Sequence, residues 1–163
     1  FLCNLLDPRS SHGQGLLFLK TFLEHCANHY PDEFPKLPEF DDPNKWLVFS
    51  EFHISNGRID ILIQNPQGSF ICVVENKVDA YEGSKQLERY GEWIKEHESI
   101  YHHSALCYLT KRGDQSLTAE KYKYFRISYH EDIAEWLEDV IPQIQAPGVA
   151  AVVHQYQAIA VKI

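Results

Sequence analysis

The sequence predicts an α/β protein in which a mixed central β-sheet is flanked by helices on both faces. Two short apolar runs, residues 57–63 and 70–77, are separated by six polar or turn-forming residues, which is typical of adjacent strands joined by a tight connection. Neither run alternates between apolar and polar residues, because 61–63 and 71–74 are all apolar. Both faces of this hairpin are therefore expected to be covered, with helices before and after it supplying the cover.

Composition supports one domain spanning residues 1–163. The chain is 44% hydrophobic and 13% aromatic, enough for a packed core, and no apolar run approaches the length of a membrane span. The formal net charge of −8 argues against a protein that coats nucleic acid without specificity, although it leaves room for a site with a local basic rim. The chain starts at Phe1 and contains no Met, which indicates that a preceding segment is missing.

Four widely spaced cysteines favour reduced, buried thiols in a cytoplasmic protein over disulfides or a zinc site. Cys72 and Cys107 fall inside apolar, strand-like runs, and no Cys-x-x-Cys pair occurs. The histidines at 97, 102 and 103 lie around a turn and are interpreted as surface residues rather than metal ligands.

The first predicted helix covers about residues 16–26, where apolar residues recur at helical spacing. The polar, glycine-bearing stretch before it is expected to delay any helix. Residues 28–44 contain four prolines and should form an irregular loop, with a length that hints at a surface or gate near the site. A strand over 45–54 then turns at 55–57 into the first run of the hairpin.

In the second half of the chain, the sequence predicts helices and strands in alternation. A helix is entered through 78–82 and runs to about Glu96, and a strand over 104–110 follows it in a parallel crossover. Residues 121–127 are expected to form a basic, aromatic strand, either an ordinary edge strand or one that touches nucleic acid. Amphipathic helices cover 130–140 and 150–161, and the last is apolar enough to dock on the body of the protein or to support a homo-oligomer.

Charged residues interrupt the apolar hairpin. Asp60 lies on the first strand, and Glu75 and Lys77, two apart, point to the same face of the second strand while Asn76 points away. If Asp60 pairs beside Glu75, two carboxylates meet in a partly buried place, where repulsion and desolvation are costly. Mg²⁺ offsets this cost well, because it takes oxygen ligands and is usually held by one or two carboxylates. Lys77 could then act on water or neutralise developing negative charge.

These residues resemble a known metal site. Asp60 followed after a hairpin by Glu75-Asn76-Lys77 resembles the motif of the PD-(D/E)XK nuclease superfamily, and Gln86 with Tyr90 matches the Gln-x-x-x-Tyr element of its RecB-like members. The order of elements is similar over roughly residues 13–139. The resemblance implies a restriction-endonuclease-like αβββαβ core and a Mg²⁺- or Mn²⁺-dependent nuclease that hydrolyses phosphodiester bonds in DNA, with RNA not excluded.

The resemblance also implies roles for the motif residues. Asp60 and Glu75 would bind metal together with the backbone carbonyl of Asn76, and Lys77 would act on the nucleophilic water. Gln86 and Tyr90 share a helix face and could hold the phosphate or the water; packing alone is the alternative role for Tyr90.

The sequence offers two candidates for a third metal-binding carboxylate. Superfamily members often add one from the first helix, where Glu24 is the only acidic residue, but Glu24 could simply be solvated. Glu51 on the strand before Asp60 could also reach the cluster, or it could be an ordinary exposed glutamate. A rival interpretation keeps the fold without catalysis, as a nucleic-acid- or protein-binding module in which Asp60 and Lys77 form a buried salt bridge.

Overall fold

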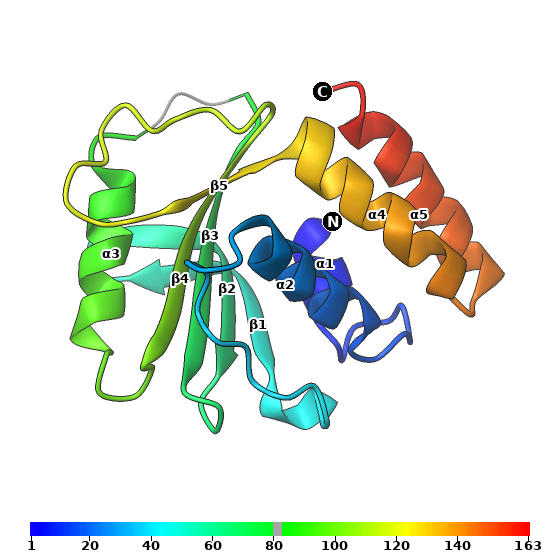
Figure 1. Ribbon diagram of the computed structural model, residues 1–163, viewed down its shortest axis with the longest axis horizontal. Helices are drawn as coiled ribbons and strands as arrows, with labels where there is room; N and C mark the ends of the chain where they lie inside the picture. The colour runs from blue at the N-terminus through cyan, green and yellow to red at the C-terminus, as the bar shows by residue number, and fades with distance from the viewer. Residues whose placement is uncertain (80–82) are drawn as a thin grey trace.

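A five-stranded sheet forms the centre of the protein, in a computed structural model that describes residues 1–79 and 83–163 (Figure 1). The strands stand in chain order across the sheet. The first three pair antiparallel, and the third, fourth and fifth pair parallel. Their bounds are β1 Leu47–Ile54, β2 Gly57–Asn65, β3 Phe70–Lys77, β4 His103–Thr110 and β5 Phe125–Ser128. The predicted α/β class with a mixed sheet is confirmed.

Helices cover the sheet on both faces, as predicted. Helix α3 (Gln86–Glu96) provides the crossover between β3 and β4 and lies alone on one side, while the remaining helices gather on the other (Figure 1). These are α1 (Leu2–Leu6), α2 (Leu17–His29), α4 (Ala134–Val140, after a π-helical turn Tyr129–Ile133) and α5 (Pro147–Ala160). Short 3₁₀ turns cover Pro43–Lys45 and Ile141–Gln143. Within the described residues, none of the helices is long and apolar enough to cross a membrane.

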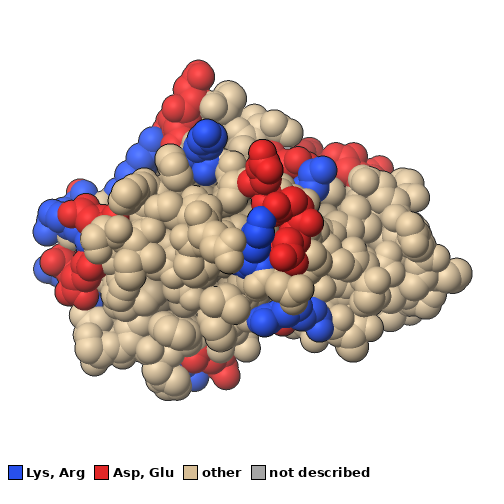
Figure 2. All heavy atoms as spheres, turned by 90° about the horizontal axis from the view of Figure 1, so that it is seen from below, with Lys and Arg blue, Asp and Glu red and all other residues tan. Residues whose placement is uncertain are grey.

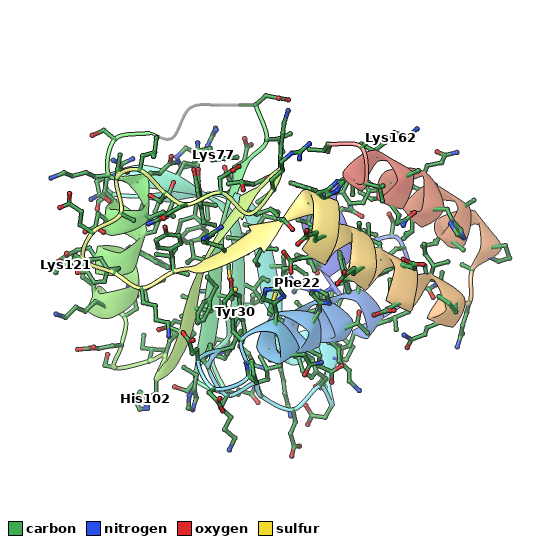
Figure 3. All side chains as sticks on the ribbon, turned by 45° about the horizontal axis from the view of Figure 1, so that its top comes forward. Phe22, Tyr30, Lys77, His102, Lys121 and Lys162 are labelled. Carbon is green, nitrogen blue, oxygen red and sulfur yellow. The ribbon has the colours of Figure 1, made fainter. Side chains whose placement is uncertain are left out.

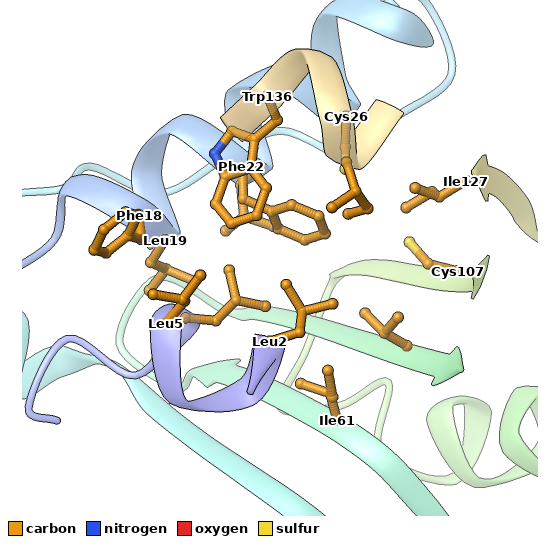
Figure 4. Close-up of a cluster of buried hydrophobic side chains, with 14 of the residues drawn as sticks. Leu2, Leu5, Phe18, Leu19, Phe22, Cys26, Ile61, Cys107, Ile127 and Trp136 are labelled. Atoms are coloured by element: carbon orange, nitrogen blue, oxygen red, sulfur yellow. The ribbon is translucent and has the colours of Figure 1, made fainter. Parts of the chain in front are cut away.

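Each face of the sheet buries its own hydrophobic cluster, which explains why the strands do not alternate in sequence. On the multi-helix face, side chains of α1, α2 and α4 such as Leu2, Phe22 and Trp136 meet Ile61 and Cys107 of the sheet (Figure 4). On the α3 face, the alternate strand residues pack with Leu87, Tyr90 and Ile94. A strand that is apolar on both faces can sit only in the middle of such a three-layer arrangement.

The structure corrects the predicted N-terminus and the start of α3. Leu2–Leu6 form a short helix where none was predicted, and its Leu2, Leu5 and Leu6 are buried. Helix α3 begins only at Gln86, because Lys85 before it adopts a left-handed conformation (φ 53°). The part of the predicted helix over 80–82 lies outside the described residues.

The predicted basic strand over 121–127 is mostly wrong. Only Phe125–Ser128 pair with β4, while the segment before them packs against α3. The Glu88 carboxylate accepts hydrogen bonds from the backbone N–H groups of residues 120, 121 and 122, and the Tyr122 hydroxyl donates to Glu92 at 2.7 Å. These acceptors on α3 satisfy the backbone donors that a strand would have paired, so the local β propensity is overridden.

The four cysteines are free, and Cys26, Cys72 and Cys107 are buried, in agreement with the sequence. Sγ atoms of Cys72 and Cys107 lie 3.8 Å apart on neighbouring strands. The three histidines at 97, 102 and 103 do not form a metal site: within the described part of the chain, no three His, Cys, Asp or Glu side chains are grouped so as to hold a metal ion.

Candidate active site

The Asp60–Lys77 end of the β2–β3 hairpin brings the predicted charged residues together. The ladder pairs Ile61 with Val74, and one further step along it sets Asp60 opposite Glu75. The backbone N–H of Asn76 donates to Asp60 Oδ2 at 2.8 Å, so the two strands stay connected beyond the last regular pair. Figure 3 shows Lys77 at the opposite end of the sheet from His102, as expected for the carboxyl end of β3 and the amino end of β4.

Glu75 is deeply buried, with a side chain 1% exposed. Lys77 Nζ lies 2.9 Å from Glu75 Oε1, yet neither oxygen of Glu75 accepts a well-aligned hydrogen bond from the described residues. Burial raises the pKa of Glu75 to about 7; Lys77 opposes that rise, and repulsion from Asp60 adds to it. The protein therefore holds a carboxylate whose ionised form is poorly compensated by its own side chains.

Helix α3 is tied to the Asp60 strand through the Gln-x-x-x-Tyr pair. Gln86 Nε2 donates to the Tyr90 hydroxyl at 2.9 Å, and that hydroxyl donates to the backbone carbonyl of Arg58 at 2.5 Å. The spacing of four residues places both side chains on one helix face, as predicted. Because Arg58 is two residues from Asp60, this relay fixes the helix against the strand that carries the carboxylate.

Tyr90 lies in the hydrophobic core beneath α3. A position outside the core would leave its ring exposed, but the side chain is 0% exposed and belongs to the cluster under α3. Burial raises its pKa to about 12, so the phenol stays protonated and acts as a hydrogen-bond donor. Tyr90 thus serves packing and holds Arg58, and a direct contact with substrate stays a prediction.

Unpaired buried polar atoms are concentrated at this end of the sheet. Of seven buried side-chain nitrogen and oxygen atoms that lack a hydrogen bond among the described residues, four belong to the site. They are Oε1 and Oε2 of Glu75, Oε1 of Gln86 and Nε of Arg89. Native proteins leave few such atoms, and a cluster of them points to a ligand that completes the network.

Arg89 was not predicted as a site residue. It follows Gln86 by three positions on α3, and its Nη1 donates to the Ser84 carbonyl while its Nε is buried without a partner. The only signal available in the sequence was this spacing, which places a helical residue on nearly the same face as Gln86.

Neither candidate for a third carboxylate joins the cluster. Glu24 lies on α2 with Lys20 at 4.0 Å, and its side chain is 45% exposed. Glu51 falls in β1 between the pairs Ser50–Ile61 and Phe52–Ile59, level with Asp60, but its side chain is 67% exposed and pairs with Arg58 at 3.3 Å. Glu51 also has a left-handed backbone (φ 53°), which interrupts the ladder at this level.

The donor set nevertheless fits a hard divalent cation. Asp60 and Glu75 supply two carboxylates, and both oxygens of Glu75 lack hydrogen bonds from the described residues. Mg²⁺ is commonly held by one or two carboxylates and completes its shell with water, so a third side chain is not required. A bound cation would also favour the ionised form of Glu75, which burial disfavours.

Comparison with known proteins identifies the class to which this fold and site belong. The family model of the PD-(D/E)XK nuclease superfamily matches residues 1–157. The chain therefore belongs to the PD-(D/E)XK nuclease superfamily, and the five-stranded mixed sheet is consistent with its restriction-endonuclease-like core.

One curated protein also resembles a segment of the chain. Catabolic 3-dehydroquinase 1 of Fusarium vanettenii is 32% identical over 65 residues, which is 40% of this chain and 45% of that enzyme. The chain thus matches less than half of that relative, and the similarity is confined to a segment. No solved structure gives a significant match.

Proposed function

We propose that this protein is a metal-dependent nuclease that hydrolyses phosphodiester bonds in DNA with Mg²⁺ or Mn²⁺. Membership in the superfamily supports nuclease chemistry in general. The observation that carries the proposal is the buried carboxylate of Glu75, level with Asp60 and surrounded by polar atoms without partners. A site with unpaired acceptors at this position is better suited to binding a cation and a phosphate than to stabilising the apo fold.

The chain's own residues can each be given a task. The bound cation would supply positive charge that polarises a phosphate oxygen. Asp60 and Glu75 would hold it together with the Asn76 carbonyl. Lys77, only 2.9 Å from Glu75, would then be released from neutralising that carboxylate and would orient water or stabilise charge developing on the phosphate.

Gln86 and Arg89 would face the phosphate from α3. Gln86 uses its amide nitrogen on Tyr90, which leaves Oε1 as an acceptor for water. Arg89 keeps Nε as a donor for a phosphate oxygen. Tyr90 would position both the helix and Arg58 rather than react.

A catalytically silent binding module is the second candidate, and the short ion pair favours it. Its buried salt bridge joins Lys77 to Glu75 rather than to Asp60, which instead accepts a hydrogen bond from the Asn76 backbone. A buried pair of this kind can serve specificity of the fold alone. It leaves unexplained why Gln86 Oε1 and Arg89 Nε are buried beside this pair without hydrogen bonds to the described residues.

The substrate and setting follow as parts of the proposal. The formal net charge of −8 argues for nucleic acid bound locally at the site rather than over an extended basic surface. On the face at the turn end of the hairpin, away from Lys77, acidic and basic side chains likewise intermingle (Figure 2). DNA is the proposed substrate, and RNA is the alternative. Four free cysteines suit the cytoplasm. The exposed Val152, Ile159 and Val161 at the C-terminal helix keep a homo-oligomer as a prediction.

The deciding experiment incubates the purified protein with circular and linear DNA and with RNA, in Mg²⁺, in Mn²⁺ and in chelator. Cleavage that requires metal and is lost in Asp60→Ala supports the proposal, and calorimetry should show that Asp60→Ala and Glu75→Ala lose Mn²⁺ binding. Unchanged Mn²⁺ binding in either variant would contradict the site. Absence of cleavage of every substrate, with the variants folded, would favour the silent module.

A further inference from the structure

A second polar cavity lies beside the carboxyl ends of β4 and β5. Its volume is about 290 Å³, and its lining includes His29 at the end of α2, Arg112 after β4, and Arg126 and Ser128 of β5. None of these residues was assigned a role in the metal site. The cavity combines two guanidinium groups with the first turn of the helical segment that starts after Ser128.

The buried acidic residue that lines this cavity, Asp132, is already hydrogen-bonded within the protein. Asp132 Oδ2 accepts hydrogen bonds from the Ser128 backbone N–H at 2.7 Å and from its hydroxyl at 2.8 Å. Asp132 Oδ1 faces His29 Nδ1 at 3.1 Å and His25 Nε2 at 3.6 Å. Although burial alone would raise it, the pKa of Asp132 is lowered by His25, Ser128 and His29, so the residue is anionic and engaged.

The two arginines, in contrast, keep donors available. Arg126 uses Nε on the Gly113 carbonyl at 2.6 Å, which fixes its planar head and leaves its terminal nitrogens uncommitted. Arg112 is exposed and forms neither an ion pair nor a hydrogen bond with the described residues. Glu131 at the rim is the one acidic side chain of the lining besides Asp132. Two guanidinium groups converging on one cavity form an arrangement suited to a phosphate.

The cavity also lies at a useful distance from the proposed scissile position. Lys77 pairs with Thr110 and Thr110 with Ser128, so the three residues mark one level at the same edge of the sheet. Two strand spacings separate Lys77 from Ser128, about 10 Å. One nucleic-acid strand can cover a span of this length with phosphates that are close neighbours along the chain.

We propose that the cavity formed by Arg112, Arg126, His29 and Ser128 binds a backbone phosphate of the polynucleotide, close along the strand to the phosphate at Asp60 and Glu75. The inference rests on the proposed nuclease function and adds a second anchoring point for the same strand. Binding there fixes the register of the strand over the site but reads no base, because phosphate contacts carry no sequence information.

The test measures binding without catalysis. A fluorescently labelled single-stranded DNA of about 12 nucleotides is titrated with wild type, Arg112→Gln and Arg126→Gln in chelator over a series of salt concentrations. Each variant should bind roughly 3- to 10-fold more weakly at low salt, and the slope of log affinity against log salt should fall by about 0.7 for each lost contact with a single strand. Arg112→Gln is the primary variant, because it removes no contact within the described protein.

The matched control removes a positive charge elsewhere. Arg9→Gln and Lys20→Gln neutralise cations in the N-terminal part of the chain, outside the lining of the cavity. Both variants should leave the slope of log affinity against log salt unchanged. Mn²⁺ binding by calorimetry should be the same in Arg112→Gln as in wild type. An unchanged slope in both cavity variants, or an equal loss in the controls, would overturn the inference.

A second arm separates polynucleotide from a small anion. Inorganic phosphate is titrated by calorimetry into wild type and Arg112→Gln. Tight phosphate binding that depends on Arg112, with DNA affinity unaffected by the same variant, would overturn the polynucleotide interpretation. If DNA binding depends on Arg112 but the protein cleaves no substrate, the proposed phosphate site stands and the proposed nuclease activity does not.

Discussion

The two ends of the β2–β3 hairpin differ in whether their polar side chains find hydrogen-bond partners. At the turn, Asn65 Oδ1 accepts from the Gly68 N–H at 2.9 Å, and the Ser69 hydroxyl donates to the Ile100 carbonyl and accepts from the His102 N–H. At the other end, Glu75 holds two oxygens without well-aligned hydrogen bonds. Both ends belong to the same pair of strands and share the same two hydrophobic clusters.

The comparison shows which end of the hairpin is stable without a ligand. The turn closes its own hydrogen bonds and therefore needs no ligand to reach its lowest free energy. The charged end leaves desolvated acceptors that cost free energy in the absence of a partner. Unsatisfied polar groups of this kind are expected where a protein binds a ligand, which supports the proposed site at this end of the hairpin.

The largest effect is expected from removing a lysine at the charged end of the hairpin, compared with removing one near the turn. Lys77→Ala should lower the rate of cleavage by about 10² to 10⁴ because the ammonium beside Glu75 is lost, while the protein stays folded and keeps its Mn²⁺ affinity. Lys45→Ala removes the ion pair with Asp41 near the turn and should leave the rate unchanged. Rates are measured on the preferred DNA, and folding by circular dichroism. A Lys77→Ala protein that unfolds even in excess metal would support the silent module.

Stability should depend on pH through Glu75. Its folded pKa of about 7 lies above the unfolded value of 4.5, so the folded state binds more protons between these values. The contribution to the free energy of unfolding is therefore present below pH 4.5 and falls by up to about 3 kcal/mol as pH rises through 7. Urea denaturation at pH 5 and pH 8 measures it, with Glu75→Gln showing a smaller difference.

Metal should reverse this loss. Excess Mn²⁺ is expected to raise the melting temperature more at pH 8 than at pH 5, because the cation binds the ionised carboxylates. Equal shifts at both pH values would exclude Glu75 as a ligand. No such coupling is expected from the turn end, which has no buried carboxylate.

One hydrogen-bonding side chain can be removed from each end for a matched comparison. Tyr90→Phe deletes the donor to the Arg58 carbonyl, and Asn65→Ala deletes the acceptor for Gly68, so each should cost about 1–3 kcal/mol of unfolding free energy. Only Tyr90→Phe should also weaken Mn²⁺ binding and slow cleavage, since it loosens the strand that carries Asp60. Equal activities in the two variants would limit Tyr90 to packing.

The smallest effect is expected at Glu51. Because its side chain is exposed and contacts only the Arg58 side chain by an ion pair, Glu51→Gln should change the rate of cleavage by less than about threefold. Glu51→Gly should raise the free energy of unfolding by up to about 1 kcal/mol, since glycine accepts the left-handed backbone without strain. A hundredfold loss of activity in Glu51→Gln would restore Glu51 as a third ligand.

Much of the architecture was determined by the sequence alone. The apolar runs at 57–63 and 70–77 fixed a buried hairpin, because strands covered on both faces cannot alternate. The two-residue spacing of Glu75 and Lys77 set them on one face, and the four-residue spacing of Gln86 and Tyr90 did the same on α3. These inferences hold because they depend on the periods of strand and helix, which neighbouring elements do not alter.

The tertiary structure decided what depends on partners distant in the chain. Residues 121–124 have the composition of a strand, yet they pack against α3, where Glu88 and Glu92 accept their hydrogen bonds. Tyr90 could face substrate or core by its spacing, and only the packing of α3 on the sheet buries its ring and directs its hydroxyl to Arg58. Which carboxylates meet is likewise set by register and backbone geometry, so Asp60 lies level with Glu75 while the left-handed turn at Glu51 leaves that side chain in solvent.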